Sequence, residues 1–168
     1  MKSNTHHVSA SAVETIGLQA REHPLVFTDT FGSLEEYCLF LMHLRAYEEA
    51  ARRSDGVSVL DLGCNNGYGT HLLADSASSV IGCDVSESAL ADARKRYPEL
   101  DFRQVDGVTL PFANSQFDLV TSFQVIEHVP DTAAYIAEIR RVLKSPGMAI
   151  FTTPNAAIRL DPGMPPWN

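Results

Sequence analysis

The stretch of residues 59–69, which reads VLDLGCNNGYG, constrains the fold more than any other part of this sequence. An apolar run passes directly into a segment that contains Gly63, Gly67 and Gly69, and a helical pattern of apolar residues follows. Glycine allows a sharp turn and lets a ligand come close to the backbone. A buried strand that turns through glycines into a helix is typical of α/β proteins, whose ligands lie at the carboxyl ends of the strands.

Apolar runs and helical patterns alternate along the rest of the chain. The alternation indicates βαβ units, which build a parallel sheet with helices on both faces. We therefore expect one α/β domain over residues 33–155, a three-layer sandwich with a doubly wound parallel sheet. An N-terminal lead-in, 1–32, would precede it and a Pro- and Gly-rich C-terminal loop, 156–168, would follow. Strands are predicted at 57–62, 79–84, 101–105, 117–123 and 148–153, and helices at 33–53, 68–75, 86–97 and 131–143.

Aspartates stand at or near the ends of three successive predicted strands: Asp61, Asp84 and Asp106. An acid at the end of the first strand suits an ammonium group. A carboxylate at the end of the second can accept both hydroxyls of a ribose, and one at the end of the third can accept an adenine amino group. Each aspartate alone could be a solvated strand end or a helix cap. Because the three ends meet at one edge of a parallel sheet, a shared nucleoside site is favoured.

The glycine spacing argues against a dinucleotide site. A nicotinamide or flavin protein would carry the pattern GxGxxG, whereas the glycines here are Gly63, Gly67 and Gly69. Asp61 would also repel a pyrophosphate. A nicotinamide-dependent oxidoreductase is therefore kept only as an alternative.

Six segments, taken in order and beginning with the glycine turn, resemble the class I S-adenosylmethionine-dependent methyltransferases of the methyltransferase 11/12 type. The resemblance spans about residues 57–155 and implies a Rossmann-like sheet with strand order 3-2-1-4-5. It also implies S-adenosyl-L-methionine as the cofactor, methyl transfer as the reaction and S-adenosyl-L-homocysteine as the product. The segments are Val59–Gly69, Ile81–Ser86, Val105–Gly107 with Leu110–Phe112, Phe117–Val120, Ile126–Val129 and Arg141–Gly147.

The resemblance assigns roles to individual residues. The backbone from Gly63 to Gly67 would hold the methionine part of the cofactor with Asp61 near its amino group, Asp84 would bind the ribose, and residues 106–107 would lie beside the adenine. Asn65 replaces the family's middle glycine, and asparagine tolerates a left-handed backbone better than most residues. The cofactor-binding residues that the resemblance implies are Tyr47, Asp61, Gly63, Cys64, Asn65, Gly67, Tyr68, Asp84, Val85, Asp106, Gly107, Phe123 and Gln124.

Three of these residues lie before the first strand or at the end of the fourth. Tyr47 lies in a helix that resembles the segment with which the family roofs the cofactor, and it could pack on the ligand or be a plain core aromatic. Phe123 and Gln124, just past the fourth strand, would line the methyl-donor side.

Glu127 and His128 are the candidate catalytic residues. An imidazole can take the proton that is released when a hydroxyl or amine is methylated. The family uses this pair without one fixed role, so a structural role stays open. Metal-dependent RNA 2′-O-methyltransferases carry a further Glu three residues before such a pair, where this chain has Gln124, a weaker ligand. That activity is therefore an alternative only, and no metal is assigned.

The charge balance bears on the partner. The chain has 13 Lys and Arg residues and 21 Asp and Glu residues, which give a net charge of −8. This balance opposes binding to DNA, which depends on basic groups, so a small-molecule methyl acceptor is expected. No apolar run approaches the roughly 20 residues that cross a bilayer. We therefore expect a cytoplasmic protein with no membrane partner.

Only residues 154–168 follow the last predicted strand. The family usually adds a helix and two more strands there, so strands 6 and 7 are expected to be lacking. The last strand would then be an open edge, through which a homodimer could form. Part of the acceptor pocket would be absent too, so a cofactor-binding but inactive fragment or regulatory module is a further alternative.

Overall fold

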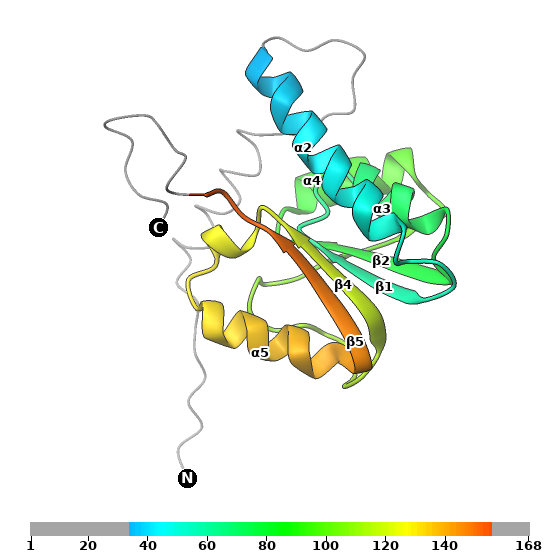
Figure 1. The fold of residues 1–168 in the computed structure, drawn as a ribbon, viewed down its shortest axis with the longest axis vertical. Coiled ribbons are helices and arrows are strands. Elements are labelled where there is room, and N and C mark those ends of the chain that lie inside the picture. Colours follow the sequence, from blue (N-terminus) through cyan, green and yellow to red (C-terminus); the bar gives the residue numbers. More distant parts are fainter. Residues whose placement is uncertain (1–33, 156–168) are drawn as a thin grey trace.

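The computed structural model describes residues 34–155, with side chains from Tyr37 onward. The predicted lead-in, 1–32, and the predicted C-terminal loop, 156–168, lie outside the described residues. Strands and helices alternate as predicted (Figure 1). The elements are α2 (Leu34–Ala51), β1 (Ser58–Leu62), α3 (Tyr68–Ala74), β2 (Ser79–Asp84), α4 (Glu87–Arg96), β3 (Asp101–Gln104), β4 (Phe117–Phe123), the short 3-10 helix η1 (Ile126–His128), α5 (Thr132–Val142) and β5 (Leu143–Thr152).

The strands form one sheet in the order β3-β2-β1-β4-β5, which confirms the predicted order. Neighbouring strands are parallel throughout, and Leu60 of β1 stands between Ile81 of β2 and Val120 of β4. The order reverses between β1 and β4. In an open α/β sheet, the crevice outside the carboxyl ends at such a reversal is where ligands bind.

Helices cover both faces of the sheet, with α2 and α3 on one side and α5 on the other (Figure 1). On the first side Val59, Leu73 and Leu119 are buried together with Tyr47 of α2. On the other side Leu60 and Val120 pack with Ile139 and Val142 of α5. Successive strand residues point to opposite faces, so an apolar run such as β1 supplies both cores.

Side chains at the helix starts explain where two helices begin. The Ser86 hydroxyl accepts the N–H of Ala89 at 3.3 Å and caps α4, and Asp131 accepts the N–H of Ala134 at 2.9 Å and caps α5. Each oxygen satisfies a backbone donor that has no partner inside the helix. The predicted helices begin at these two caps, and the observed helices begin one residue later.

The last strand differs from its prediction. We expected a helix that reaches Leu143 and a strand from Met148, but β5 begins at Leu143, directly after α5. Leu143 pairs with Phe117 of β4, across an irregularity in the register. The Lys144 ammonium also lies 2.7 Å from the Asp118 carboxylate on that strand. Contacts with β4 therefore hold a segment whose composition alone indicates a turn.

None of the helices between residues 34 and 155 is long and apolar enough to cross a membrane. Cys64 and Cys83 are buried, whereas Cys38 on α2 is exposed.

Candidate functional site

The glycine turn after β1 has the left-handed backbone that its composition indicates. Gly63, Asn65 and Gly67 have φ angles of 77°, 47° and 81°. The N–H groups of Gly63 and Cys64 donate to the carbonyl oxygen of Cys83 at 2.7 and 3.0 Å. These bonds hold the turn against the end of β2, and Asn65 occupies the left-handed position without breaking it.

Asp84 ties β2 to the same turn. Its Oδ2 accepts the N–H of Asn65 and its Oδ1 accepts the N–H of Ser86, both at 2.9 Å. The side chain is buried, and burial raises the pKa of the carboxyl above its ordinary value. Each oxygen keeps a second lone pair, so the carboxylate can still accept hydrogen bonds from a ligand.

Asp61 at the end of β1 is completely buried and is held by hydroxyl groups. Thr70 donates to Oδ2 at 2.7 Å, Thr121 donates to Oδ1 at 2.8 Å, and the Tyr47 hydroxyl lies 3.2 Å from Oδ1. Burial raises the pKa of Asp61 to about 6, and the three hydrogen bonds limit the rise. Three hydroxyl groups of the chain thus hydrogen-bond to this carboxylate.

Three aromatic rings gather beside Asp61. The ring of Tyr47 meets Phe123 edge to face at a centroid distance of 4.8 Å and meets Tyr68 at 5.4 Å. All three side chains are buried. Tyr47 thus packs against two aromatic rings and hydrogen-bonds Asp61, and its contact with a ligand stays a prediction.

The ends of β2 and β3 approach each other at Val85 and Gly107. A Cβ on Gly107 would stand 3.3 Å from Val85, and the φ angle of Gly107 is 80°, so this position favours glycine. Asp106 is exposed, and its Oδ1 accepts the N–H groups of Val108 and Thr109 at 2.8 and 2.7 Å. One carboxylate oxygen thus orders the loop while the side chain faces solvent.

The segment after β4 carries Gln124, Glu127 and His128. Gln124 has a φ angle of 55°, and its side-chain amide donates to the Thr152 hydroxyl at 3.1 Å, so it is tied to β5. Glu127 and His128 lie half-buried in η1, and burial raises the pKa of Glu127 while a hydrogen bond with Thr153 limits the rise. Residues 34–155 contain no group of three or more His, Cys, Asp or Glu side chains arranged for a metal.

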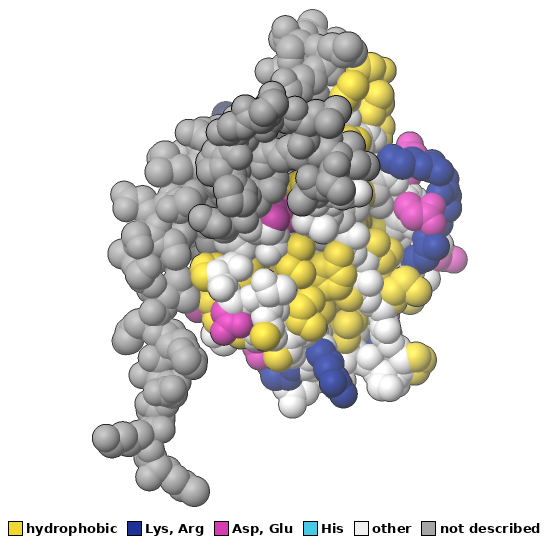
Figure 2. All heavy atoms as spheres, turned by 60° about the vertical axis from the view of Figure 1, so that its left-hand side comes forward, with side chains coloured by type: hydrophobic (Ala, Val, Ile, Leu, Met, Phe, Trp, Pro, Cys, Tyr) yellow, Lys and Arg dark blue, Asp and Glu magenta, His cyan; other side chains and the backbone are white. Residues whose placement is uncertain are grey.

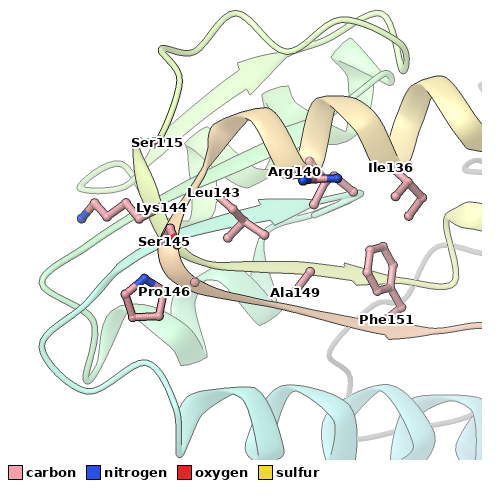
Figure 3. Close-up of a pocket in the computed structure, with 11 residues that line it drawn as sticks. Ser115, Ile136, Arg140, Leu143, Lys144, Ser145, Pro146, Ala149 and Phe151 are labelled. Carbon is pink, nitrogen blue, oxygen red and sulfur yellow. The ribbon is translucent and has the colours of Figure 1, made fainter.

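A groove of about 570 Å³ lies elsewhere, between α5 and the outer edge of β5 (Figure 3). Ile136, Leu143 and Phe151 supply apolar walls, with Arg140 and Lys144 among the lining residues. None of the predicted cofactor residues lines it. Their chemistry meets at the carboxyl ends of β1, β2 and β4, so we take that edge as the candidate site.

Sequence reasoning missed three residues that shape this site. Thr121 stands beside Asp61 in the register of β1 and β4, and Thr70 reaches the same carboxylate from α3. Val125 lies where a Cβ on Gly63 would stand, with a separation of 2.3 Å. No local pattern marks any of them. Thr121 and Val125 are about 60 residues from their partners, and Thr70 reaches Asp61 across the glycine turn.

Comparison with known proteins identifies the family. Residues 60–151, which contain the glycine turn, Asp84 and the η1 pair, match a family described as "Methyltransferase domain". The chain belongs to the class I methyltransferase family. A "Probable S-adenosylmethionine-dependent methyltransferase" from Mycolicibacterium smegmatis is 42% identical over 132 residues, which are 79% of this chain and 51% of that protein.

Other relatives of the methyltransferase domain agree with this placement. A "Ubiquinone biosynthesis O-methyltransferase" from Ruegeria sp. is 34% identical over 60% of this chain and 42% of its own length. The crystal structure of an S-adenosylmethionine-dependent methyltransferase from Mesorhizobium loti has a TM-score of 0.59 and 30% identity, and covers 64% of this chain and 53% of its own. The chain thus spans about half the length of the relatives it matches.

Proposed function

We propose that this methyltransferase domain binds S-adenosyl-L-methionine across the carboxyl ends of its strands and transfers the methyl group to a small acceptor. The observation that carries the proposal is the tether between Asp84 and the glycine turn, in which Asn65 donates to the carboxylate at 2.9 Å. It lies beside the reversal of strand order, where α/β proteins bind nucleotides. The family match supports the same reading.

The residues present suit the proposed cofactor. Asp84 has lone pairs for the ribose hydroxyls. Gly107 has no side chain, so its backbone would lie beside the adenine. The turn around Gly63, Cys64, Asn65 and Gly67 would hold the amino-acid end. Phe123 with Gln124 would border the methyl donor, and Tyr47, Asp61, Tyr68 and Asp106 complete the set.

The cofactor supplies a methyl group bonded to a positively charged sulfur. When bound, the cofactor would supply this methyl group to an acceptor hydroxyl and would leave as the neutral thioether, while the hydroxyl would give up its proton. His128 lies half-buried just after β4, where its imidazole can take this proton. Alignment of the two reactants supplies much of the acceleration, so no second catalytic group is required.

The acceptor we propose is a small molecule with a hydroxyl group. The net charge of −8 opposes a long nucleic acid. Among the relatives, the protein from Ruegeria sp. carries the name of an O-methyltransferase, which supports oxygen as the acceptor atom. Gln124 is bound to Thr152 of β5, an arrangement that disfavours a metal-dependent RNA 2′-O-methyltransferase.

A second candidate is a module that binds the cofactor without turnover. Among residues 34–155, the outer edge of β5 pairs with no other strand. We further propose that a second copy of the chain pairs with this edge. Ile136 and Met148 are 39% and 47% exposed here. Figure 2 shows hydrophobic side chains gathered on one face, with Lys and Arg side chains beneath them.

Calorimetry with S-adenosylmethionine, S-adenosylhomocysteine and NAD tests the function directly. We expect binding of the first two and none of the third, together with methyl transfer to a member of a panel of small phenols and catechols. Binding without transfer would favour the inactive module. Binding of NAD alone would refute the proposal in favour of an oxidoreductase.

A further inference from the structure

Tyr68 carries a buried hydroxyl that finds no hydrogen-bond partner within the described part of the chain. Its side chain is 5% exposed. The residue is the first of α3 and directly follows Gly67, so it borders the glycine turn. A buried polar atom is normally paired, and an unpaired one needs an explanation.

Other buried tyrosines of the domain are paired. The Tyr47 hydroxyl lies 3.2 Å from Asp61, and the Tyr135 hydroxyl lies 3.0 Å from the Ser122 hydroxyl. Burying a hydroxyl without a partner is unfavourable. A phenylalanine would fill the same space at position 68 without that cost, so the hydroxyl calls for a partner from outside the described residues.

The place of Tyr68 along the sheet indicates which part of a ligand it would meet. Its ring contacts Tyr47, which in turn contacts Phe123 at the end of β4. Asp84 ends β2 and Gly107 follows β3, on the opposite side of β1 from β4. A nucleoside that lies over β2 and β3 therefore extends its remaining end toward Tyr68.

We propose that the Tyr68 hydroxyl donates a hydrogen bond to the carboxylate at the amino-acid end of the bound cofactor. This inference rests on the function proposed above. Burial and the nearby Asp61 raise the pKa of the phenol well above its ordinary value, so the hydroxyl keeps its proton and can act as a donor. A carboxylate is the matching acceptor, and hydrogen bonds to charged groups are the strong ones.

The test compares two ligands that differ at this end. S-adenosylhomocysteine has the amino-acid group, and 5′-methylthioadenosine shares its nucleoside and thioether but lacks that group. Calorimetry of Tyr68→Phe should show at least a tenfold weaker affinity for S-adenosylhomocysteine, the scale of a lost bond to a charged group, and an unchanged affinity for 5′-methylthioadenosine. The melting temperature of the unliganded variant should be unchanged or higher, because no hydrogen bond is lost.

Tyr135→Phe is the matched control, since it removes a hydroxyl that is paired with Ser122. We expect it to lower the melting temperature and to leave both affinities unchanged. Equal affinity of the wild type and Tyr68→Phe for S-adenosylhomocysteine would overturn the inference alone. So would equal losses for both ligands, or a fall in the melting temperature of Tyr68→Phe. If the wild type binds neither ligand, the proposed function itself fails.

Discussion

The hydroxyl of Tyr47 on α2 lies 3.2 and 3.3 Å from the two carboxylate oxygens of Asp61 at the end of β1. Both side chains are buried. The helix that precedes the sheet is thereby joined to the strand that leads into the glycine turn. The position of α2 over the site therefore depends on a carboxylate whose pKa is raised to about 6.

This raised pKa predicts a pH-dependent stability. The folded protein holds the Asp61 proton more tightly than the unfolded chain, where the carboxyl has its ordinary value of 3.8. The resulting stabilisation is complete below pH 3.8 and is lost as the pH rises to about 6. Relative to Asp61→Asn, the wild type should lose about 3 kcal/mol of unfolding free energy across this window.

Urea unfolding of both proteins between pH 4 and 7.5 measures the difference. Asp118→Asn is a useful control, because Lys144 and Ser58 hold the pKa of Asp118 low, at about 2. The unfolding free energy of Asp118→Asn should therefore fall between pH 4 and 7.5 by as much as that of the wild type. A difference between wild type and Asp61→Asn that is constant with pH would contradict the prediction.

Gly63 has no room for a side chain. Gly63→Ala should lower the free energy of unfolding by about 2–4 kcal/mol, because the new Cβ meets Val125 and the backbone is left-handed. In the double variant Gly63→Ala/Val125→Ala the clash is removed, so the loss should be smaller than the sum of the single losses. Strictly additive losses would show that Val125 is not the obstacle.

Asp84→Asn should weaken binding of S-adenosylhomocysteine by about 1.5–3 kcal/mol, the scale of lost hydrogen bonds to a charged group. The amide would also turn a donor toward the N–H of Asn65 or Ser86, so the melting temperature should fall. Asp101→Asn, on the exposed start of β3, is the control and should change neither quantity strongly. Unchanged affinity in a folded Asp84→Asn protein would remove Asp84 from the ribose site.

His128→Ala should leave the affinity for S-adenosylhomocysteine nearly intact and lower turnover by about 100-fold, the effect of losing a general base. The measurement is methyl transfer to whichever phenol or catechol the wild type methylates. Glu127→Gln distinguishes the role of Glu127 from that of His128, because it removes the carboxylate charge and keeps the imidazole. Wild-type turnover in His128→Ala would return His128 to a structural role.

The outer edge of β5 should cause self-association. Met148→Lys places a charge on that edge, which proteins use to block strand pairing, and should shift the chain toward the monomer. Met42→Lys is the matched control, since Met42 is 60% exposed and belongs to α2 rather than to β5. Light scattering at several concentrations measures both. A wild type that is monomeric at every concentration would refute the proposed dimer.

Local patterns predict the elements of this domain well. β2 and β4 have the predicted bounds, and the capping residues Ser86 and Asp131 mark the starts of two helices. Strand periodicity and cap chemistry act over a few residues, so they can be read from the chain itself. The glycine turn is of the same kind, because its left-handed backbone at Gly63 and Gly67 is a property of the residue type.

Tertiary structure decided what those elements meet. Thr121 comes beside Asp61 only through the parallel pairing of β4 with β1, and Val125 reaches Gly63 by the same pairing. β5 begins at Leu143 because β4 offers it a partner, against the turn composition that follows. Parallel neighbours are joined by long crossovers, so their contacts link distant residues and leave no local pattern. The unpaired hydroxyl of Tyr68 is the plainest case, since only the packed structure shows which buried donors have partners.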